Sequence, residues 1–409
     1  MLVDGSVVRV HVIDSATGFA QACESLRHGT GPFAVDAERA SGFTYSQRAY
    51  LIQVYRRDAG TFLFDPPAIG DLSELTTVAG DEEWIFHAAS QDLACLREVG
   101  IAPINIFDTE LAARLLGMER VGLGAVVEEL LDVHLEKAHS AVDWSTRPLP
   151  EPWLEYAALD VELLVDLRDV MIAMLQDANK TEFAAQEFRA TVNKPEREVS
   201  IEPWRRLSGL HTLRSPRLVA TARELWITRD RIAAARDVAP GRLVPDSSLI
   251  AAVIANPESK AALSKVKAFH GRASRSLIDE WWSAIERGRA TEDLPALRVK
   301  SSELPPPRAW ADRNPDAHER LQRMRPRLQD RAEDLNIPVE NLLTPSVLRS
   351  IAWEPPVSFD EPSISEALQH GGARAWQIEI CAPLILEALL DDTPLVDSES
   401  QPDSSLSAD

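Results

Sequence analysis

The stretch Phe33-Ala34-Val35-Asp36-Ala37-Glu38 places two carboxylates inside an otherwise apolar segment. Its apolar content predicts a buried strand. Alternate side chains of a strand point to the same face, so Asp36 and Glu38 project together and the apolar residues project to the other side. Two buried carboxylates this close repel each other unless a cation lies between them or one takes up a proton. A divalent cation that prefers oxygen ligands, magnesium or manganese, fits this pair.

Length and composition indicate a large globular protein. The chain has 409 residues with 45% hydrophobic content, which predicts two or three domains. It contains no apolar run of about eighteen residues and no signal-peptide core at its start, so we expect a cytoplasmic protein without a membrane partner. Cys23, Cys95 and Cys381 lack C-x-x-C spacing, which argues against a disulfide framework or a zinc site.

The net charge of -21 is unevenly distributed along the chain. Residues 1–200 carry roughly -17, residues 201–300 roughly +7 and residues 301–409 roughly -11. Phosphate contacts are therefore expected in the middle segment. The acidic N-terminal part needs a metal ion or local arginines before a phosphodiester can approach it.

The pattern of the first two hundred residues predicts an α/β sheet with helices on its faces. Three strands follow one another as a meander, over 33–38, 49–55 and 61–65. A later helix, expected over 151–178, carries Asp160 on the same face as Tyr156, Leu164 and Leu167. A carboxylate within such an apolar stripe must be buried against a compensating group.

Proline-containing linkers divide the remainder of the chain. Two mainly helical segments follow the α/β part, and their proline-initiated helices lie about one hundred residues apart, which suggests a repeat. We therefore expect an α/β domain over 1–192, a linker over 193–204, a helical domain over 205–290, a linker over 291–307, a second helical domain over 308–390 and a disordered acidic tail over 391–409.

Each acidic residue also has a structural explanation. Asp36 and Glu38 could face solvent at a strand end, and Asp92 could cap the helix that follows Ser90. Tyr156 could be a core aromatic residue. Asp160 is the hardest to explain structurally, because a carboxylate in an apolar stripe has few such roles.

Taken together, three motifs resemble those of the DEDD superfamily of 3′–5′ exonucleases, in its Tyr-containing branch, and within that branch the ribonuclease D family. The resemblance covers roughly residues 8–190 and is specific, because the motifs occur in the expected order with supporting sequence between them. The helical segments resemble HRDC domains, the second more distantly than the first. The three motifs are Val35-Asp36-Ala37-Glu38, Phe86-His87-Ala88-Ala89-Ser90-Gln91-Asp92-Leu93 and Tyr156-Ala157-Ala158-Leu159-Asp160.

The resemblance implies a ribonuclease H-like α/β exonuclease domain with a mixed sheet, followed by two all-α HRDC-like domains. Asp36, Glu38, Asp92 and Asp160 would hold two divalent cations, Mg²⁺ or Mn²⁺, and Tyr156 would orient the attacking water. A tyrosine with an ordinary pKa near 10 is a poor base, so positioning is favoured over proton abstraction. The implied activity is 3′–5′ exoribonuclease cleavage that releases nucleoside 5′-monophosphates, with tRNA precursors or other structured RNA as partners.

Three further residues are candidates for substrate contact. His87 could meet a phosphate or be a core histidine. Trp144 could stack on a base and Arg147 could bind a phosphate, but an arginine and a tryptophan that anchor a loop to the core would give the same pattern.

Other functions stay open at this point. A 3′–5′ DNA exonuclease of the Werner-type branch would use the same motifs, since nothing in the metal site distinguishes ribose from deoxyribose. A catalytically inactive RNA-binding protein is disfavoured, because all four acids and the tyrosine are present. A purely structural helical adaptor leaves Asp160 unexplained. No stable protein partner is evident.

Overall fold

A computed structural model describes residues 11–135, 141–195, 201–297, 304–391 and 393. These residues belong to two compact units. The first comprises Met1–Thr109, Leu123–Arg168 and Thr191–Lys300, and the second comprises Glu110–Gly122, Asp169–Ala190 and Ser301–Asp409, each within the described limits. The acidic tail expected over 391–409 lies almost entirely outside the described residues.

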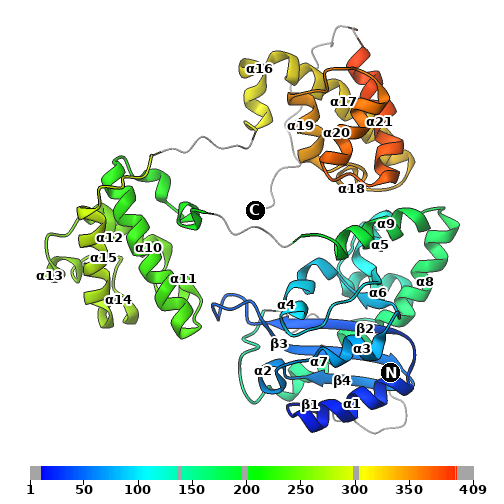
Figure 1. The fold of residues 1–409 in the computed structure, drawn as a ribbon, viewed down its shortest axis with the longest axis horizontal. Coiled ribbons are helices and arrows are strands. Elements are labelled where there is room, and N and C mark those ends of the chain that lie inside the picture. The colour runs from blue at the N-terminus through cyan, green and yellow to red at the C-terminus, as the bar shows by residue number, and fades with distance from the viewer. Residues whose placement is uncertain (1–10, 136–140, 196–200, 298–303, 392, 394–409) are drawn as a thin grey trace. The chain divides into compact units, whose positions relative to one another are not determined.

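A mixed sheet with the strand order β1-β4-β3-β2-β5-β6 forms the core of the first unit (Figure 1). The expected meander is present, since β2 pairs antiparallel with β3 and β3 pairs antiparallel with β4. The other pairs, β1 with β4, β2 with β5 and β5 with β6, are parallel. The strands are β1 (Val12–Ile13), β2 (Thr30–Arg39), β3 (Ala49–Arg57), β4 (Gly60–Phe64), β5 (Trp84–Phe86) and β6 (Ile106–Asp108).

Strand register assigns the acidic pair to one face of this sheet. Asp36 lies opposite Gln53, which lies opposite Leu63, so these three side chains share a face. Ala37 and Phe64 belong to the other face, where the ring of Phe19 from α1 (Ala16–His28) meets Phe64 edge-on. Ser15 caps α1 by accepting a hydrogen bond from the Gly18 N–H. One face is therefore sealed by a helix, and the other carries the acids.

Helix α7 (Glu151–Glu162) packs on β2, β3 and β4 at the acidic face. Leu154 and Ala157 of α7 are buried there against Leu51 and Leu63. The single helix expected over 151–178 is interrupted at Leu163, after which α8 (Leu164–Asp177) begins. Asp160 thus lies in the last turns of α7, where its side chain is only partly buried.

Short helices connect the strands of the sheet. A turn of 3₁₀ helix, η1 (Ala89–Gln91), precedes α4 (Leu93–Glu98), and α5 (Thr109–Leu115) follows β6 directly. The remaining helices of this region are α2 (Pro66–Ile69), α3 (Glu74–Ala79), α6 (Leu123–Leu131) and α9 (Thr181–Val192).

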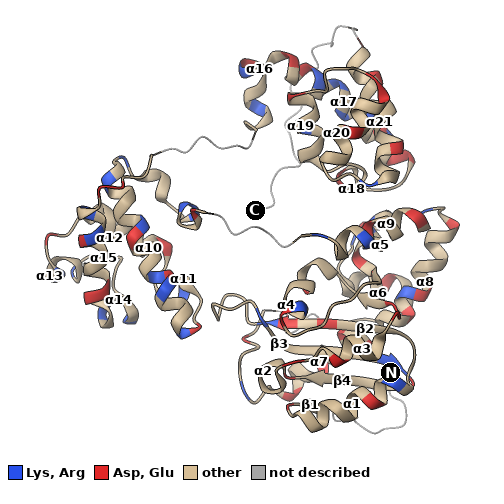
Figure 2. Cartoon of the chain, in the orientation of Figure 1, with Lys and Arg blue, Asp and Glu red and all other residues tan. Residues whose placement is uncertain are grey.

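The segment expected to be basic and helical has its own hydrophobic core around Trp281, Phe269, Leu225 and Leu249. Figure 2 shows that its two longest helices carry both Lys or Arg and Asp or Glu. These helices are α10 (Pro216–Arg236), α11 (Pro240–Leu243), α12 (Asp246–Ala255), α13 (Lys260–Leu263), α14 (Arg272–Ser276) and α15 (Ile278–Ala290).

The C-terminal helices of the second unit repeat part of this order. A long helix, a one-turn helix and a proline-initiated helix follow one another in α17, α18 and α19, as a long helix, a one-turn helix and a helix preceded by Pro245 do in α10, α11 and α12. The C-terminal helices are α16 (Trp310–Arg313), α17 (Pro315–Asp334), α18 (Val339–Leu342), α19 (Pro345–Trp353), α20 (Glu361–His370) and α21 (Ala375–Leu390).

Polar contacts explain why residues 169–190 belong to the second unit. The ring of Phe183 stacks on Trp376 with 4.3 Å between ring centroids, and the indole of Trp376 donates to the buried Glu187. The buried Lys180 ammonium donates to the backbone carbonyls of Leu115 and Asn336.

Over the described part of the chain, no helix is both long and apolar enough to cross a bilayer.

Candidate active site

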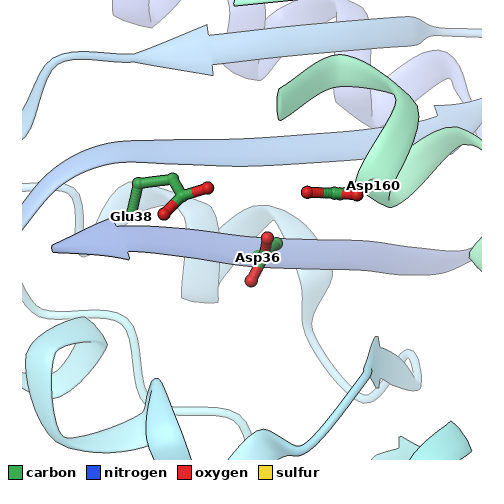
Figure 3. A group of neighbouring side chains, drawn as sticks. All are labelled: Asp36, Glu38 and Asp160. Carbon is green, nitrogen blue, oxygen red and sulfur yellow. The ribbon is translucent and has the colours of Figure 1, made fainter. Parts of the chain in front are cut away.

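Three carboxylates converge on the acidic face of the sheet. Asp36 and Glu38 project from β2, and Asp160 faces them from α7 (Figure 3). Each of the three offers an oxygen atom, and these atoms all lie within 4.8 Å of one another. Asp36 and Glu38 lie on the same face of a strand, and a helix far away in the sequence adds Asp160 to them, so the three acids form one cluster.

Asp92 lies next to this cluster rather than within it. It occupies the N-cap position of α4, but its side chain makes no capping hydrogen bond, which removes the structural role that the sequence left open. Its carboxylate is buried, with 6% of the residue exposed. The negative charge of Asp36 acts on Asp92, and that of Asp92 acts on Glu38, so the four acids form one electrostatic group.

Asp108 holds the turn that leads to Asp92. Its carboxylate accepts hydrogen bonds from the backbone N–H groups of Ala88 and Ala89, at 3.1 and 2.9 Å. Ala88 has φ 67°, the left-handed region that residues with a Cβ rarely occupy. Sequence reasoning missed this role of Asp108, although an acid at the end of a buried strand was a signal for it.

The acids hold their protons more tightly than usual. Burial, together with the charge of Asp36, raises the pKa of Asp160 to about 7 and that of Glu38 to about 9. Burial also raises the pKa values of Asp36 and Asp92. A divalent cation would remove this repulsion, because the carboxylates would ionise against a positive charge.

A buried amide also fits a polar occupant. Gln53 lies directly opposite Asp36, is completely buried, and neither its amide nitrogen nor its oxygen has a hydrogen-bond partner among the described residues. An unpartnered buried amide is costly, about 1–3 kcal/mol for each group. The oxygen donors and this orphaned amide therefore suit a hydrated divalent cation.

Tyr156 lies one helical turn before Asp160 and is hydrogen-bonded to it. Burial and the charge of Asp160 raise the pKa of its hydroxyl above the ordinary value. The hydroxyl therefore stays protonated at neutral pH and can orient a water molecule, but cannot abstract a proton as a phenolate.

Family models match most of the described chain. A 3′-5′ exonuclease model matches residues 10–176 and an HRDC domain model matches residues 220–285. A model of the 3′ to 5′ exonuclease C-terminal domain matches residues 303–389, the part expected to be a second, divergent HRDC-like domain.

Curated relatives extend the similarity along the chain. A ribonuclease D of Jannaschia sp. (strain CCS1) is 30% identical over 354 residues, which cover 84% of this chain and 88% of that protein. The chain belongs to the ribonuclease D family. It is a 3′–5′ exoribonuclease, as its resemblance in sequence implied. A ribonuclease D of Pseudomonas paraeruginosa is 28% identical over 383 residues, which cover 90% and 95% of the two chains.

Solved structures confirm the expected fold of this ribonuclease D family member. A protein from Bifidobacterium adolescentis is similar over 93% of this chain and 97% of its own, with a TM-score of 0.87 and 35% identity. The ribonuclease D of Escherichia coli is similar over 93% and 98% of the two chains, with a TM-score of 0.67 and 23% identity, which is evidence for the fold alone.

The three candidate substrate contacts have structural partners. His87 shares a hydrogen bond with the Thr109 hydroxyl through its Nδ1, at 2.9 Å. Trp144 is completely buried against Trp153, which leaves no open ring face for a base. This placement favours the core and anchoring roles that the sequence left open for the two residues.

Arg147 is held by several hydrogen bonds. Its Nε donates to the Asp65 carboxylate at 2.6 Å, and its two terminal nitrogens donate to the backbone carbonyls of Trp144, Thr146 and Tyr50. A guanidinium bonded on all sides anchors a loop. The structure thus favours the anchoring role for Arg147 too.

Asp160→Asn is expected to stabilise the metal-free protein at pH 8, by on the order of 2 kcal/mol. The pKa of Asp160 in the folded protein, about 7, lies above the ordinary value of 3.8. Protonation of Asp160 therefore stabilises the wild type fully below pH 4, and this stabilisation is lost as pH rises through 7. Urea unfolding in EDTA at pH 4, 6 and 8 should show the difference between the variant and the wild type growing with pH.

Glu155→Gln is the matched control, because Glu155 is an exposed carboxylate on the same helix. Its unfolding should follow that of the wild type at each pH. Equal stability of Asp160→Asn and wild type at pH 8 would show that Asp160 is not strained in the metal-free site.

Proposed function

We propose that this exoribonuclease is metal-dependent and that two divalent cations, Mg²⁺ or Mn²⁺, bind between Asp36, Glu38, Asp92 and Asp160. The observation that carries the proposal is the convergence of Asp36, Glu38 and Asp160 within 4.8 Å in a site where their protons are held unusually tightly. Such a pair of cations supplies an activated water and stabilises charge on the phosphoryl oxygens.

The protein side chains then have separate tasks. The four carboxylates fix the positions of the cations, and Asp108 keeps the segment that carries Asp92 in place. Tyr156 donates its single hydroxyl proton to Asp160, and its oxygen accepts a hydrogen bond from the attacking water and so orients it. Because the pKa of Tyr156 is raised, its task is positioning.

The proposed reaction removes one nucleotide at a time from a 3′ end. A water oxygen forms a bond to the phosphorus of the last phosphodiester, and the bond from this phosphorus to the 3′ oxygen of the preceding nucleotide breaks. That 3′ oxygen takes up a proton. The products are a nucleoside 5′-monophosphate and an RNA shortened by one residue with a free 3′ hydroxyl.

We infer that the substrates are tRNA precursors or other structured RNAs in the cytoplasm. The ribonuclease D of E. coli is an exoribonuclease involved in structured RNA processing, and the shared fold supports the same substrate class here. We also propose that the exonuclease domain spans residues 1–192 and that the helical domains span 205–290 and 308–390.

Several cationic side chains of the first helical domain form ion pairs. Arg229 pairs with Asp246 at 2.6 Å and Arg223 pairs with Asp293 at 2.8 Å. Other ion pairs are Arg231 with Glu280, Arg287 with Glu224 and Lys260 with Asp279. Such pairs engage these cationic side chains within the domain and leave fewer of them available for RNA.

The cationic side chains of one loop in this domain are not engaged in ion pairs within the described part of the chain. Residues 264–276, here called the basic loop, comprise a connecting segment and the short helix α14. They contain no acidic residue, and their cationic side chains are exposed. In the described part of the chain they form no ion pair. We infer that the basic loop contacts the RNA backbone through Lys265, Lys267, His270, Arg272 and Arg275.

The function is tested with 3′-labelled RNA and DNA oligonucleotides in Mg²⁺, Mn²⁺ or EDTA. We expect wild-type protein to release nucleoside 5′-monophosphates from RNA, and EDTA to abolish the release. Asp36→Ala should lower the rate by about a thousandfold or more, since it removes a ligand from the centre of the site.

Asp81→Ala serves as the control, because it removes an exposed carboxylate near β5. Tyr156→Phe should bind Mn²⁺ as the wild type does while losing most turnover. Cleavage that persists in EDTA contradicts the metal-dependent mechanism, equal degradation of DNA contradicts the RNA preference, and release of nucleoside 3′-monophosphates contradicts the bond assignment.

Lys265→Ala/Lys267→Ala is expected to raise the KM for RNA and to weaken its salt dependence. Each phosphate contact of a single strand contributes about 0.7 to the slope of log affinity against log salt, so loss of two contacts should reduce the slope by roughly 1.4. Binding titrations of a metal-free complex between about 50 and 200 mM salt measure this slope.

Arg231→Ala/Lys260→Ala is the matched control. It removes the same charge from the same domain, but both side chains are engaged in ion pairs. Its slope should equal that of the wild type. Equal slopes of log affinity against log salt for the two double variants would show that the basic loop does not contact RNA.

A further inference from the structure

A cationic side chain faces the acidic cluster. Arg39 ends β2 directly after Glu38, and its Nη2 lies 4.0 Å from the Oδ1 of Asp92. Burial raises the pKa values of Asp36, Glu38 and Asp92, and the positive charge of Arg39 opposes the rise at each of them. Arg39 is therefore close enough to act electrostatically on three of the four acids.

An irregularity of the sheet lies beside Arg39. Strict alternation along β2 would place Arg39 and Glu38 on opposite faces. Glu38 pairs with Leu51, whereas Arg39 pairs with Ala49, so Tyr50 is an extra residue on β3. A bulge of this kind changes the direction of side chains beside it, and such bulges are common next to active sites.

The guanidinium of Arg39 keeps its hydrogen-bond donors available. A guanidinium has five N–H donors, and the structure gives Arg39 no hydrogen bond within the described ranges. The distance of 4.0 Å to Asp92 is too long for one. With 28% of its side chain exposed, Arg39 can be reached by a ligand. Its donors are available, whereas those of Arg147 are engaged in hydrogen bonds.

We propose that Arg39 binds the phosphate of the 3′-terminal nucleotide and matches its charge. This inference rests on the proposed metal site. Four ionised carboxylates balance two divalent cations, so the single negative charge of an incoming phosphodiester needs one further positive charge. Arg39 supplies that charge beside the site, and the paired N–H groups of its guanidinium can donate to the two non-bridging phosphate oxygens. Before substrate and metal arrive, the same charge partly offsets the repulsion among the acids.

The two tasks predict opposite effects of one substitution. Arg39→Gln removes a positive charge next to the cluster, so Mn²⁺ should bind the RNA-free protein about fivefold or more tightly, as followed by electron paramagnetic resonance. The KM for RNA should rise about tenfold or more, because the phosphate loses its partner. A residue with a purely structural role would weaken both kinds of binding together.

Arg39→Lys provides the conservative comparison. It keeps the charge but not the fork, so its Mn²⁺ affinity should equal that of the wild type while its KM lies between those of wild type and Arg39→Gln. Arg27→Gln is the charge-matched control, because Arg27 lies on α1 and is paired with Glu24 and Glu74. Both of its constants should be unchanged.

Weaker Mn²⁺ binding by Arg39→Gln, or an unchanged KM in both Arg39 variants, would overturn the inference. Failure of the proposed function itself would appear differently, as full activity of Asp36→Ala or of wild type in EDTA. Thermal unfolding of each variant in EDTA shows whether it is folded. If Arg39→Gln does not fold, the KM of Arg39→Lys still tests the inference.

Discussion

The mutual repulsion of carboxylates in a buried site is the constraint on which the rest of this structure depends. Asp36, Glu38 and Asp160 offer oxygens within 4.8 Å of one another, and the pKa of Glu38 rises to about 9. Such an arrangement disfavours the folded, metal-free state, because every ionised acid adds to the repulsion. The surrounding fold must hold the acids together against this repulsion, and a divalent cation would be bound by the same crowded carboxylates.

The fold meets this requirement with rigid elements. A central strand carries two acids, a helix packed across three strands carries the third, and a sealed opposite face stabilises the sheet. Asp92 lies on a less regular segment, where the Asp108 carboxylate binds two backbone N–H groups and keeps Ala88 in a left-handed conformation. Strain near the site is thus balanced by a buried carboxylate outside it. The orphaned amide of Gln53 is a second local cost that a polar occupant would remove.

Local patterns predicted the parts of the site that depend on periodicity. The spacing of two placed Asp36 and Glu38 on one face, and the helical period marked Asp160 as an acid within an apolar stripe. That these acids come together was implied only by the resemblance to the exonuclease motifs. The meander β2 to β4 was predicted from apolar runs and turns. Non-local features were not predictable. These features arise only when separate segments of the chain meet. They are the register shift at Tyr50, the hydrogen bond from the Ala88 N–H to Asp108, the helix break at Leu163 and the pairing of helix arginines with distant acids.

Anomalous scattering from crystals grown with Mn²⁺ tests the central claim most directly. The proposed site predicts two anomalous peaks on the acidic face of the sheet, about 3.5–4 Å apart, with Asp36, Glu38, Asp92 and Asp160 as ligands. Asp160→Asn crystals should lose at least one of these peaks. No peak within ligand distance of Asp36 at saturating Mn²⁺ would contradict the account, because the crowded acids would then lack the cation that explains them.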